Sequence, residues 1–356
     1  MNTTEPEFKG NQPKGLSDLT AWHAGARSES VIEPELAIID PHHHLFDAPA
    51  HGQRYMFPDL LDDMAGGHNI TATVFVEAYH SMWRRDGRPE MRPVGEAEFA
   101  AGVAAMADSG TYGNCKVAAA IVAHADLTLG ECVEDVLDAL HDRSGGRLRG
   151  IRQQVAYATG LIGSFIKYRA PEHLLLDEQF RKGFGRLARS GLSFDAWVYH
   201  TQLDEVCDLA ASFPDTTIIL NHIGGVLGVA EYRGRRDEVF ADWRNRMRAL
   251  AAHGNVNVKV GGMGMAVFGF GFEHGERPVH SEVLARAWTP YIETCVELFG
   301  PQRCMFESNF PVDKQSCGYT ELWNAFKRAT AMLSATERAC LFSETARRVY
   351  RIKNFP

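Results

Sequence analysis

The feature of this sequence that most constrains its fold is a regular alternation, from Leu36 to the C-terminus, of short apolar segments with longer amphipathic ones. The short segments are rich in β-branched and aromatic residues, as strands are. They are apolar throughout rather than at every second position, which is typical of parallel strands buried on both faces. We therefore predict eight parallel strands, at residues 36–42, 71–78, 116–123, 148–155, 192–199, 216–222, 255–260 and 303–308.

The segments between these strands have the length and the apolar spacing of helices. Eight strand–helix units fit a (β/α)8 barrel. The competing architecture is an open, doubly wound sheet, but no G-x-G-x-x-G sequence follows the first strand. The sequence SATE at 334–337 predicts a capped helix start, with Ser334 as the N-cap. The other predicted helices cover residues 94–107, 127–142, 173–189, 202–212, 236–252, 281–298 and 319–331.

Residues 1–35 are polar and rich in glycine, proline and serine, so we expect an N-terminal arm followed by one barrel domain over residues 36–356. Two long segments follow predicted strands and should lie at the C-terminal face of a barrel, where active sites are found. Residues 79–93 carry four arginines, which either form a solvated loop or attract an anionic substrate. Residues 261–280 combine glycines with phenylalanines, which we expect to form an apolar wall of the site.

The composition excludes several classes of protein. The formal net charge is −8, which argues against a protein that binds nucleic acid. Seven cysteines without a C-x-x-C motif predict a reduced, cytoplasmic chain rather than a disulfide framework or a thiolate zinc site. The first residues lack the basic and apolar regions of a signal peptide. No apolar segment approaches the roughly 20 residues that a membrane span needs.

Polar or ionisable side chains occur at the C-terminal end of every predicted strand. His42 and His44 follow the first strand and share one face because they are two residues apart, whereas His43 points the other way. A single histidine is usually a satisfied core or surface group, but polar residues at the same end of eight strands indicate a site. The other candidates are Glu77, His124, Arg152, Tyr199, His200, His222, Lys259, Glu307 and Asn309.

These motifs together resemble amidohydrolase family 2 of the amidohydrolase superfamily, and in particular its lactonase branch. That branch includes pyrone dicarboxylate lactonase, fuconolactonase and sulfomuconolactone hydrolase. The resemblance extends from Leu36 to the C-terminus and rests on the order and spacing of the motifs. The matching segments read IDPHHHLFD (39–47), GIRQ (150–153), FDAWVYHTQL (194–203), IILNHIGG (218–225), VNVKVGG (256–262) and MFESNFPVD (305–313).

The resemblance implies a distorted (β/α)8 TIM barrel of amidohydrolase type, with added C-terminal helices, that hydrolyses C–O, C–N or P–O bonds with one or two divalent metals. The family's metal-binding histidines fall on His42, His44 and His222, and His200 is a candidate for a further ligand. Three neutral imidazoles suit Zn²⁺ with one position left for water. Members of the lactonase branch also work without metal, so a zinc site and a metal-free site both remain open.

The chain departs from the family at Asn309, where the family has an aspartate that ligates metal or takes a proton from the attacking water. An amide is a poor metal ligand and cannot act as a base at neutral pH. In one interpretation Glu307, two residues earlier on the same strand face, takes over the proton transfer. In a second, Glu77 or a histidine supplies the base from another strand. In a third, the chain has lost hydrolysis.

We therefore predict a hydrolase that opens a lactone or ester of a small ring compound with activated water. Arg152 is suited to clamp a carboxylate of an anionic substrate, because a guanidinium binds carboxylates bidentately. Without metal, Lys259 and the histidines can hydrogen-bond the oxyanion. The predicted catalytic residues are His42, His44, His222, Glu307, Asn309 and Arg152. The predicted substrate-binding residues are Glu77, His124, Arg152, Tyr199 and Lys259.

Two other functions remain open at this point. A metal-dependent decarboxylase or hydratase of a small organic acid shares the H-x-H and the sixth-strand histidine. A non-catalytic ligand-binding barrel would tolerate Asn309. Each of these alternatives binds a small molecule rather than a membrane or a nucleic acid. The sequence is also compatible with a homo-oligomer, since barrels of this kind often form dimers or larger assemblies.

Overall fold

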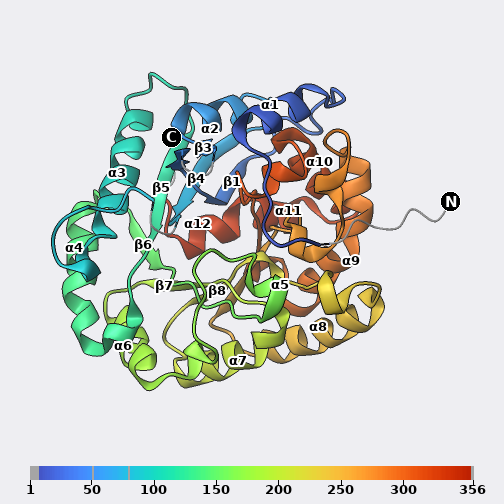
Figure 1. Cartoon of the computed structure of the whole chain (residues 1–356). Coiled ribbons are helices and arrows are strands. Elements are labelled where there is room, and N and C mark those ends of the chain that lie inside the picture. The colour runs from blue at the N-terminus through green and yellow to red at the C-terminus, as the bar shows by residue number, and fades with distance from the viewer. Residues whose placement is uncertain (1–7, 50–51, 79–80, 354–356) are drawn as a thin grey trace.

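The structure is a computed structural model that describes residues 8–49, 52–78 and 81–353. Eight parallel strands form one sheet in which each strand lies beside the next along the chain. The sheet curls into a nearly closed barrel surrounded by helices, which confirms the (β/α)8 prediction (Figure 1). The strands are β1 (Ile38–His43), β4 (Ile70–Val76), β5 (Lys116–Ala123), β6 (Leu148–Ile151), β7 (Ser193–Ala196), β8 (Ile218–Leu220), β9 (Val256–Val260) and β10 (Cys304–Phe306).

The first and last strands meet at their C-terminal ends. His43 and Phe310 form a parallel bridge, and the backbone N–H of His44 donates to the carbonyl of Phe310 at 2.8 Å. The backbone N–H of Asn309 donates to the carbonyl of His42 at 2.9 Å. This seam joins the H-x-H segment to the residues that follow β10, so the two most informative sequence motifs become neighbours.

Each helix predicted from residue 94 onward has a counterpart in the structure. Two of the predicted helices, 127–142 and 173–189, begin with 3-10 turns before their α-helical parts. The helices are α1 (Leu16–Ala24), α2 (Phe57–Met64), α3 (Val94–Asp108), α4 (Glu134–Arg143), α5 (Gly160–Gly163), α6 (Glu178–Arg189), α7 (Leu203–Ser212), α8 (Arg236–Ala251), α9 (Ser281–Phe299), α10 (Tyr319–Ala329), α11 (Ala335–Ala339) and α12 (Thr345–Val349).

Several predicted strands were too long at their C-terminal ends, two of them by three or more residues. β6 ends at Ile151 and β7 at Ala196, whereas the sequence predicted strands to 155 and 199. Residues 197–199, beyond the end of β7, are apolar and buried, so their composition alone does not distinguish them from strand residues, whereas residues 152–154, beyond the end of β6, are polar. The register pairs only Gly150 and Ile151 of β6 with β7, which leaves the following residues in connections.

The barrel interior is closed by the end of the chain. Ile39, Val74 and Ile219 from three strands pack in one cluster with Val349 and Tyr350 of the C-terminal segment. Figure 1 shows α12 in the middle of the ring of strands. An apolar plug of this kind fills the space that strands alone leave open and contributes buried area that stabilises the barrel.

The capping box predicted at 334–337 is present at the start of α11. Ser334 Oγ accepts from the backbone N–H of Glu337 at 3.3 Å, and the carboxylate of Glu337 accepts from the backbone N–H of Ser334 at 2.9 Å. These contacts satisfy two otherwise unpaired helix donors.

The described part of the expected N-terminal arm contains α1, and a short hairpin of β2 (Phe46–Ala48) and β3 (Gln53–Tyr55) follows β1. Leu19 and Trp22 of α1 are buried against the barrel domain. Residues 1–7 of the expected arm and residues 79–80 of the arginine-rich segment lie outside the described residues. All seven cysteines are free thiols. Within the described ranges, no helix is both long enough and apolar enough to span a membrane.

Candidate active site

The centre of the candidate site is a carboxylate between two imidazoles. Glu307 follows β10 directly, and its Oε1 lies 2.7 Å from Nδ1 of His222. The same oxygen accepts from the backbone N–H of His222 at 3.2 Å. Glu307 Oε2 lies 2.8 Å from Nδ1 of His42, at the end of β1. All three side chains are buried, so these contacts are shielded from water.

The chain after β8 is shaped to present His222. His222 and Ile223 have positive φ angles of 53° and 49°, and a positive φ is rare for a β-branched residue. A side chain at Gly262, after β9, would place its Cβ 2.4 Å from Nδ1 of His222. Glycine is therefore required where the β9 connection passes the imidazole. Such local strain is often found at functional sites.

His44 completes a pair of imidazoles that face each other. Nε2 of His42 and Nε2 of His44 are 3.2 Å apart. Nδ1 of His44 lies 2.9 Å from the carbonyl of Val76, so this nitrogen carries the proton and Nε2 has a free lone pair. Two imidazole nitrogens bound to one tetrahedral zinc at about 2.0–2.1 Å would lie about 3.4 Å apart. The spacing of the pair therefore suits a shared metal.

Two cationic side chains, the buried Lys259 and the mostly buried Arg152, flank His42. Nζ of Lys259 lies 3.2 Å from its Nδ1 and donates to Asp195 Oδ2 at 2.6 Å. Nη1 of Arg152 lies 3.3 Å from its Nε2, and Nε of Arg152 donates to Glu77 Oε1 at 2.6 Å. Each cation thus has its own carboxylate partner, which offsets the cost of burial.

The environment favours neutral imidazoles. Burial lowers the pKa of His42, His44 and His222 well below the usual value for histidine; the charge of Arg152 lowers all three further, and that of Lys259 lowers those of His42 and His222. Burial raises the pKa of the Glu307 carboxyl to about 8, although the charge of Lys259 opposes that rise. Neutral imidazoles are the form that binds metal or accepts a proton.

The site can hold a divalent metal. His42, His222 and Glu307 each offer a ligand atom, and these atoms all lie within 4.8 Å of one another. Oε2 of Glu307 is buried and lies 2.8 Å from Nδ1 of His42, but the two groups are not aligned for a hydrogen bond. A buried carboxylate oxygen without a hydrogen bond, next to imidazole nitrogens, can either coordinate a metal or accept a proton. The donor set of imidazole and carboxylate is one that zinc accepts.

Asn309 lies at the seam of the barrel, as the motif predicted, but its amide is already engaged. Its Nδ2 donates to Asp313 Oδ1 at 2.8 Å, and Asp313 Oδ2 accepts from the backbone N–H of Gly264 at 2.8 Å. Burial raises the pKa of the Asp313 carboxyl to about 8. Asp313 therefore links the connections that follow β9 and β10.

Three predicted site residues have other neighbours. Nδ1 of His200 accepts from the backbone N–H of Leu227 at 3.3 Å, which gives this histidine a structural contact outside the ligand group. Tyr199 is buried and its hydroxyl lies 3.5 Å from the carbonyl of Ile162. The ring of His124 lies 5.3 Å from that of Trp83, which belongs to the arginine-rich segment. The sequence placed all three at strand ends, but β7 ends before Tyr199.

The two long segments also make structural contacts. Arg84 forms an ion pair with Glu98 of α3, as expected of a solvated charged loop. The side chains of Phe268, Phe270 and Phe272 stack in sequence at 6.5 Å and 5.3 Å between ring centroids. Phe270 and Phe272 also contact aromatic residues of α9. These rings pack on a helix, so their expected role as a pocket wall stays a prediction.

Asp195 and Tyr350 were missed by the sequence reasoning. The hydroxyl of Tyr350 donates to Asp195 Oδ2 at 2.9 Å, and the amide of Asn221 donates to the same oxygen at 3.0 Å. A signal for Asp195 was available, since an acidic residue inside a predicted buried strand needs a partner. The sequence contains no comparable signal for Tyr350, because the position of its side chain depends on how the C-terminal segment enters the barrel.

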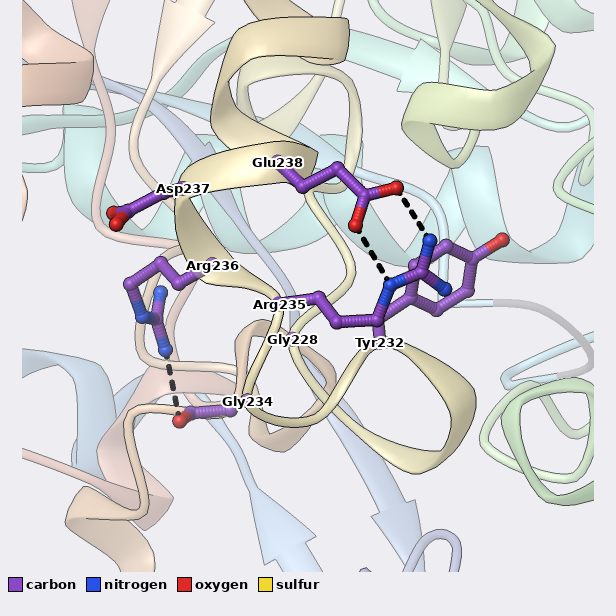
Figure 2. A pocket seen from close by; sticks show the side chains of 8 residues that line it. Gly228, Tyr232, Gly234, Arg235, Arg236, Asp237 and Glu238 are labelled. Atoms are coloured by element: carbon purple, nitrogen blue, oxygen red, sulfur yellow. Dashed lines mark hydrogen bonds and ion pairs between the residues drawn. The ribbon is translucent and has the colours of Figure 1, made fainter.

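A separate surface pocket of about 390 Å³ lies at the start of α8. Figure 2 shows its charged lining, in which Arg235 pairs with Glu238 at 2.5 Å. The guanidinium of Arg236 lies 4.3 Å from the ring centroid of Phe270 and donates to the carbonyl of Gly269 at 3.0 Å. Both arginines thus make contacts within the protein. The histidines at the strand ends do not line this pocket.

Residues 39–352 match the sequence model of a family described as amidohydrolase. The chain belongs to the amidohydrolase family. It is therefore a hydrolytic enzyme, as the motifs predicted, and the match begins one residue after the start of β1.

The chain is similar to proteins of two bacterial species. It is 32% identical over 339 residues to y4mH, an uncharacterized protein of Sinorhizobium fredii, covering 89% of this chain and 99% of that protein. It is 29% identical over 235 residues to the L-fucono-1,5-lactonase of Burkholderia multivorans, covering 66% of this chain and 72% of that enzyme. A crystal structure of a zinc-bound amidohydrolase from Burkholderia multivorans matches with a TM-score of 0.67 and 25% identity, covering 89% of this chain and 100% of that one.

Proposed function

We propose that this amidohydrolase opens the C–O bond of a small lactone or ester that carries a carboxylate. The observation that carries the proposal is the buried contact of Glu307 with Nδ1 of His222, beside the cation Arg152. A carboxylate that holds one nitrogen of an imidazole leaves the opposite nitrogen available for proton transfer, as in other hydrolytic dyads.

In the proposed reaction a water molecule attacks the carbonyl carbon of the substrate. Nε2 of His222 takes the proton of that water while Nδ1 passes its own proton to Glu307. A carboxylate with a pKa of about 8 has the proton affinity that this transfer needs near neutral pH. When the C–O bond breaks, the proton returns along the same path to the leaving oxygen, and the product is a hydroxy acid.

The cations have different roles in this proposal. Arg152 is about one tenth exposed, and its Nε and Nη2 are held by the side chain and carbonyl of Glu77. Its remaining nitrogen, Nη1, faces His42 and can donate to a substrate carboxylate or to the oxyanion. Lys259 is fully buried in its ion pair and acts on His42 rather than on substrate.

A divalent metal is compatible with the same residues. His42, His222 and Glu307 would hold it, with His44 beside His42 as a further candidate ligand. When bound, such a metal would lower the pKa of a coordinated water and polarise the substrate carbonyl. The similarity to a zinc-bound amidohydrolase supports this assignment, and the lactonase similarity supports the choice of a C–O bond.

The test is a hydrolysis screen of matched pairs. Each pair consists of a lactone that carries a ring carboxylate and the same lactone as its methyl amide, assayed by acid release at constant pH. We expect turnover of at least one carboxylate member, a preference of about tenfold or more over its amide, and loss of turnover in Glu307→Gln. Glu293→Gln, an exposed residue of α9, is the control.

Three results would overturn the proposal. Faster turnover of the neutral amides would contradict the anionic substrate. Release of CO₂ from aromatic acids in place of a ring-opened acid would indicate a decarboxylase. Tight binding without turnover, unchanged in His42→Ala, would indicate a ligand-binding barrel.

A further inference from the structure

The N-terminal segment of residues 8–25, called here the strap, lies on the loops that surround the candidate site. Asn11 Nδ2 donates to the carbonyl of Phe165, in the connection after β6, at 3.1 Å. The backbone N–H of Lys14 donates to Oε1 of Gln315, in the connection after β10, at 2.8 Å. Its ammonium donates to the carbonyl of Glu273, after β9, at 2.6 Å. All three loops follow the C-terminal ends of strands, as the site residues do.

The strand order makes this set of contacts informative. β6 is the fourth strand of the sheet and β10 is the eighth, so the two lie on opposite sides of the barrel. Asn11 and Lys14 are three residues apart, yet they reach the loops of both strands. The strap and the long connection after β6 therefore meet over the C-terminal face. In Figure 1 the dark-blue N-terminal trace runs close to α5 and then rises to α1.

The strap is fitted to the loops below it. Gly10 has a φ of +83°, and a Cβ at this position would lie 2.5 Å from Ser164 Oγ. Only glycine combines that backbone conformation with so close an approach. Trp22 is buried, and its indole N–H donates to the carbonyl of Gly275 at 2.7 Å. The ammonium of Lys14 lies 4.2 Å from the indole centroid, which joins the two anchors.

The strap lies outside the part of the chain that matches the family, which begins at residue 39. It is thus an addition to a family barrel, placed over its catalytic end. His42, His44 and His222 beneath this face are each at most 5% exposed. Elements added over the C-terminal face of a barrel commonly determine which substrates enter.

We propose that the strap limits the size of the substrate that reaches the histidines, so that compact ring acids enter and ring acids with a bulky extension do not. The substrate class in this proposal rests on the proposed function, the hydrolysis of a lactone at this site. The role of the strap as a barrier is independent of it. Lys14 and Trp22 act as specificity-determining anchors: both side chains hold the strap to the loop after β9, and Lys14 also contacts Gln315 in the loop after β10.

The first experiment measures size selection in the full-length protein. Lys14→Met and Trp22→Ala are compared with wild type on an active lactone acid and on derivatives with a butyl or benzyl extension. We expect kcat/KM for the extended substrates to rise about tenfold relative to the compact one, with kcat for the compact substrate little changed. Asp18→Asn, on the exposed side of α1, should leave the ratio unchanged. An unchanged ratio in both anchor variants would overturn the proposal.

The second experiment needs no substrate and separates the two proposals. Metal-free protein is treated with diethyl pyrocarbonate, which modifies neutral imidazoles, and the modified peptides are quantified by mass spectrometry. We expect the peptide of His42 and His44 to react several-fold faster in the anchor variants, while the exposed His141 reacts equally in all proteins. Equal rates at His42 and His44 in wild type and in folded anchor variants would contradict the strap as a barrier, whatever the enzyme hydrolyses.

Discussion

The side-chain amide of Asn309 donates a hydrogen bond of 2.8 Å to Asp313 Oδ1, four residues further along the loop after β10. Asp313 also accepts from the backbone N–H of Gly264, so both of its oxygens are in use. Asn309 therefore supplies a donor to a buried carboxyl that needs one at this position. The amide nitrogen faces Asp313, and this fixes the amide oxygen on the opposite side.

Exchanging the two residues tests this relationship. At pH 9, above the pKa of Asp313, Asn309→Asp should place two carboxylates in contact, and Asp313→Asn should leave one N–H without an acceptor. We expect each single variant to lower the free energy of unfolding by about 1–3 kcal/mol. The double exchange restores a donor between the residues and an acceptor for Gly264, so it should be more stable than either single variant in urea denaturation. Additive losses in the double variant would show that the pair is not coupled.

The pH dependence of hydrolysis reports on Glu307. Burial raises the pKa of its carboxyl to about 8, and only the ionised form can accept a proton. The kcat/KM of the free enzyme should therefore rise with pH and level off above about 8. Glu307→Gln should lower kcat by about 10²–10⁴-fold and remove this rise. A profile that is flat from pH 6 to 9 in wild type would assign the proton transfer to another group.

Much of the site could be predicted because parallel strands place their C-terminal residues at one face. His42, His44, His222 and Glu307 follow three different strands, and the barrel brings them into contact. The spacing of the H-x-H motif also predicted correctly that His43 points away, since its Nε2 lies 2.8 Å from the hydroxyl of Thr73. The order of the strands and the alternation of side chains along each strand were sufficient to predict which of these residues face the site.

The partners of the site residues could not be predicted in the same way. The pairing of Arg152 with Glu77 joins residues 75 positions apart, and each had been assigned to substrate. The contact of Asp195 with Tyr350 joins a strand to the C-terminal plug. Neither pattern nor spacing determines which of several buried charges meet, because that depends on how the side chains pack inside the closed barrel.

The metal content of the purified protein distinguishes the two forms of the mechanism. After zinc loading and removal of excess metal, elemental mass spectrometry should find close to one zinc per chain. His42→Ala and His222→Ala should weaken zinc binding by more than about tenfold, and Glu307→Gln by about 10–100-fold, because its carboxylate contributes a ligand atom and contacts both imidazoles. His141→Ala, an exposed histidine on α4, serves as the control. Wild-type protein that retains no zinc at any loading would favour the metal-free form.

The free energy of unfolding should depend strongly on both partners of the buried ion pair between Lys259 and Asp195. Lys259→Met would leave Asp195 buried with only hydroxyl and amide donors, so we expect a loss of about 3–5 kcal/mol in the free energy of unfolding. The double variant Lys259→Met/Asp195→Asn removes both charges and should recover at least half of that loss. Arg244→Met breaks an exposed pair and should cost less than about 1 kcal/mol in the same urea denaturation. A double variant no more stable than Lys259→Met would mean that Lys259 stabilises the barrel through its contact with His42 rather than through Asp195.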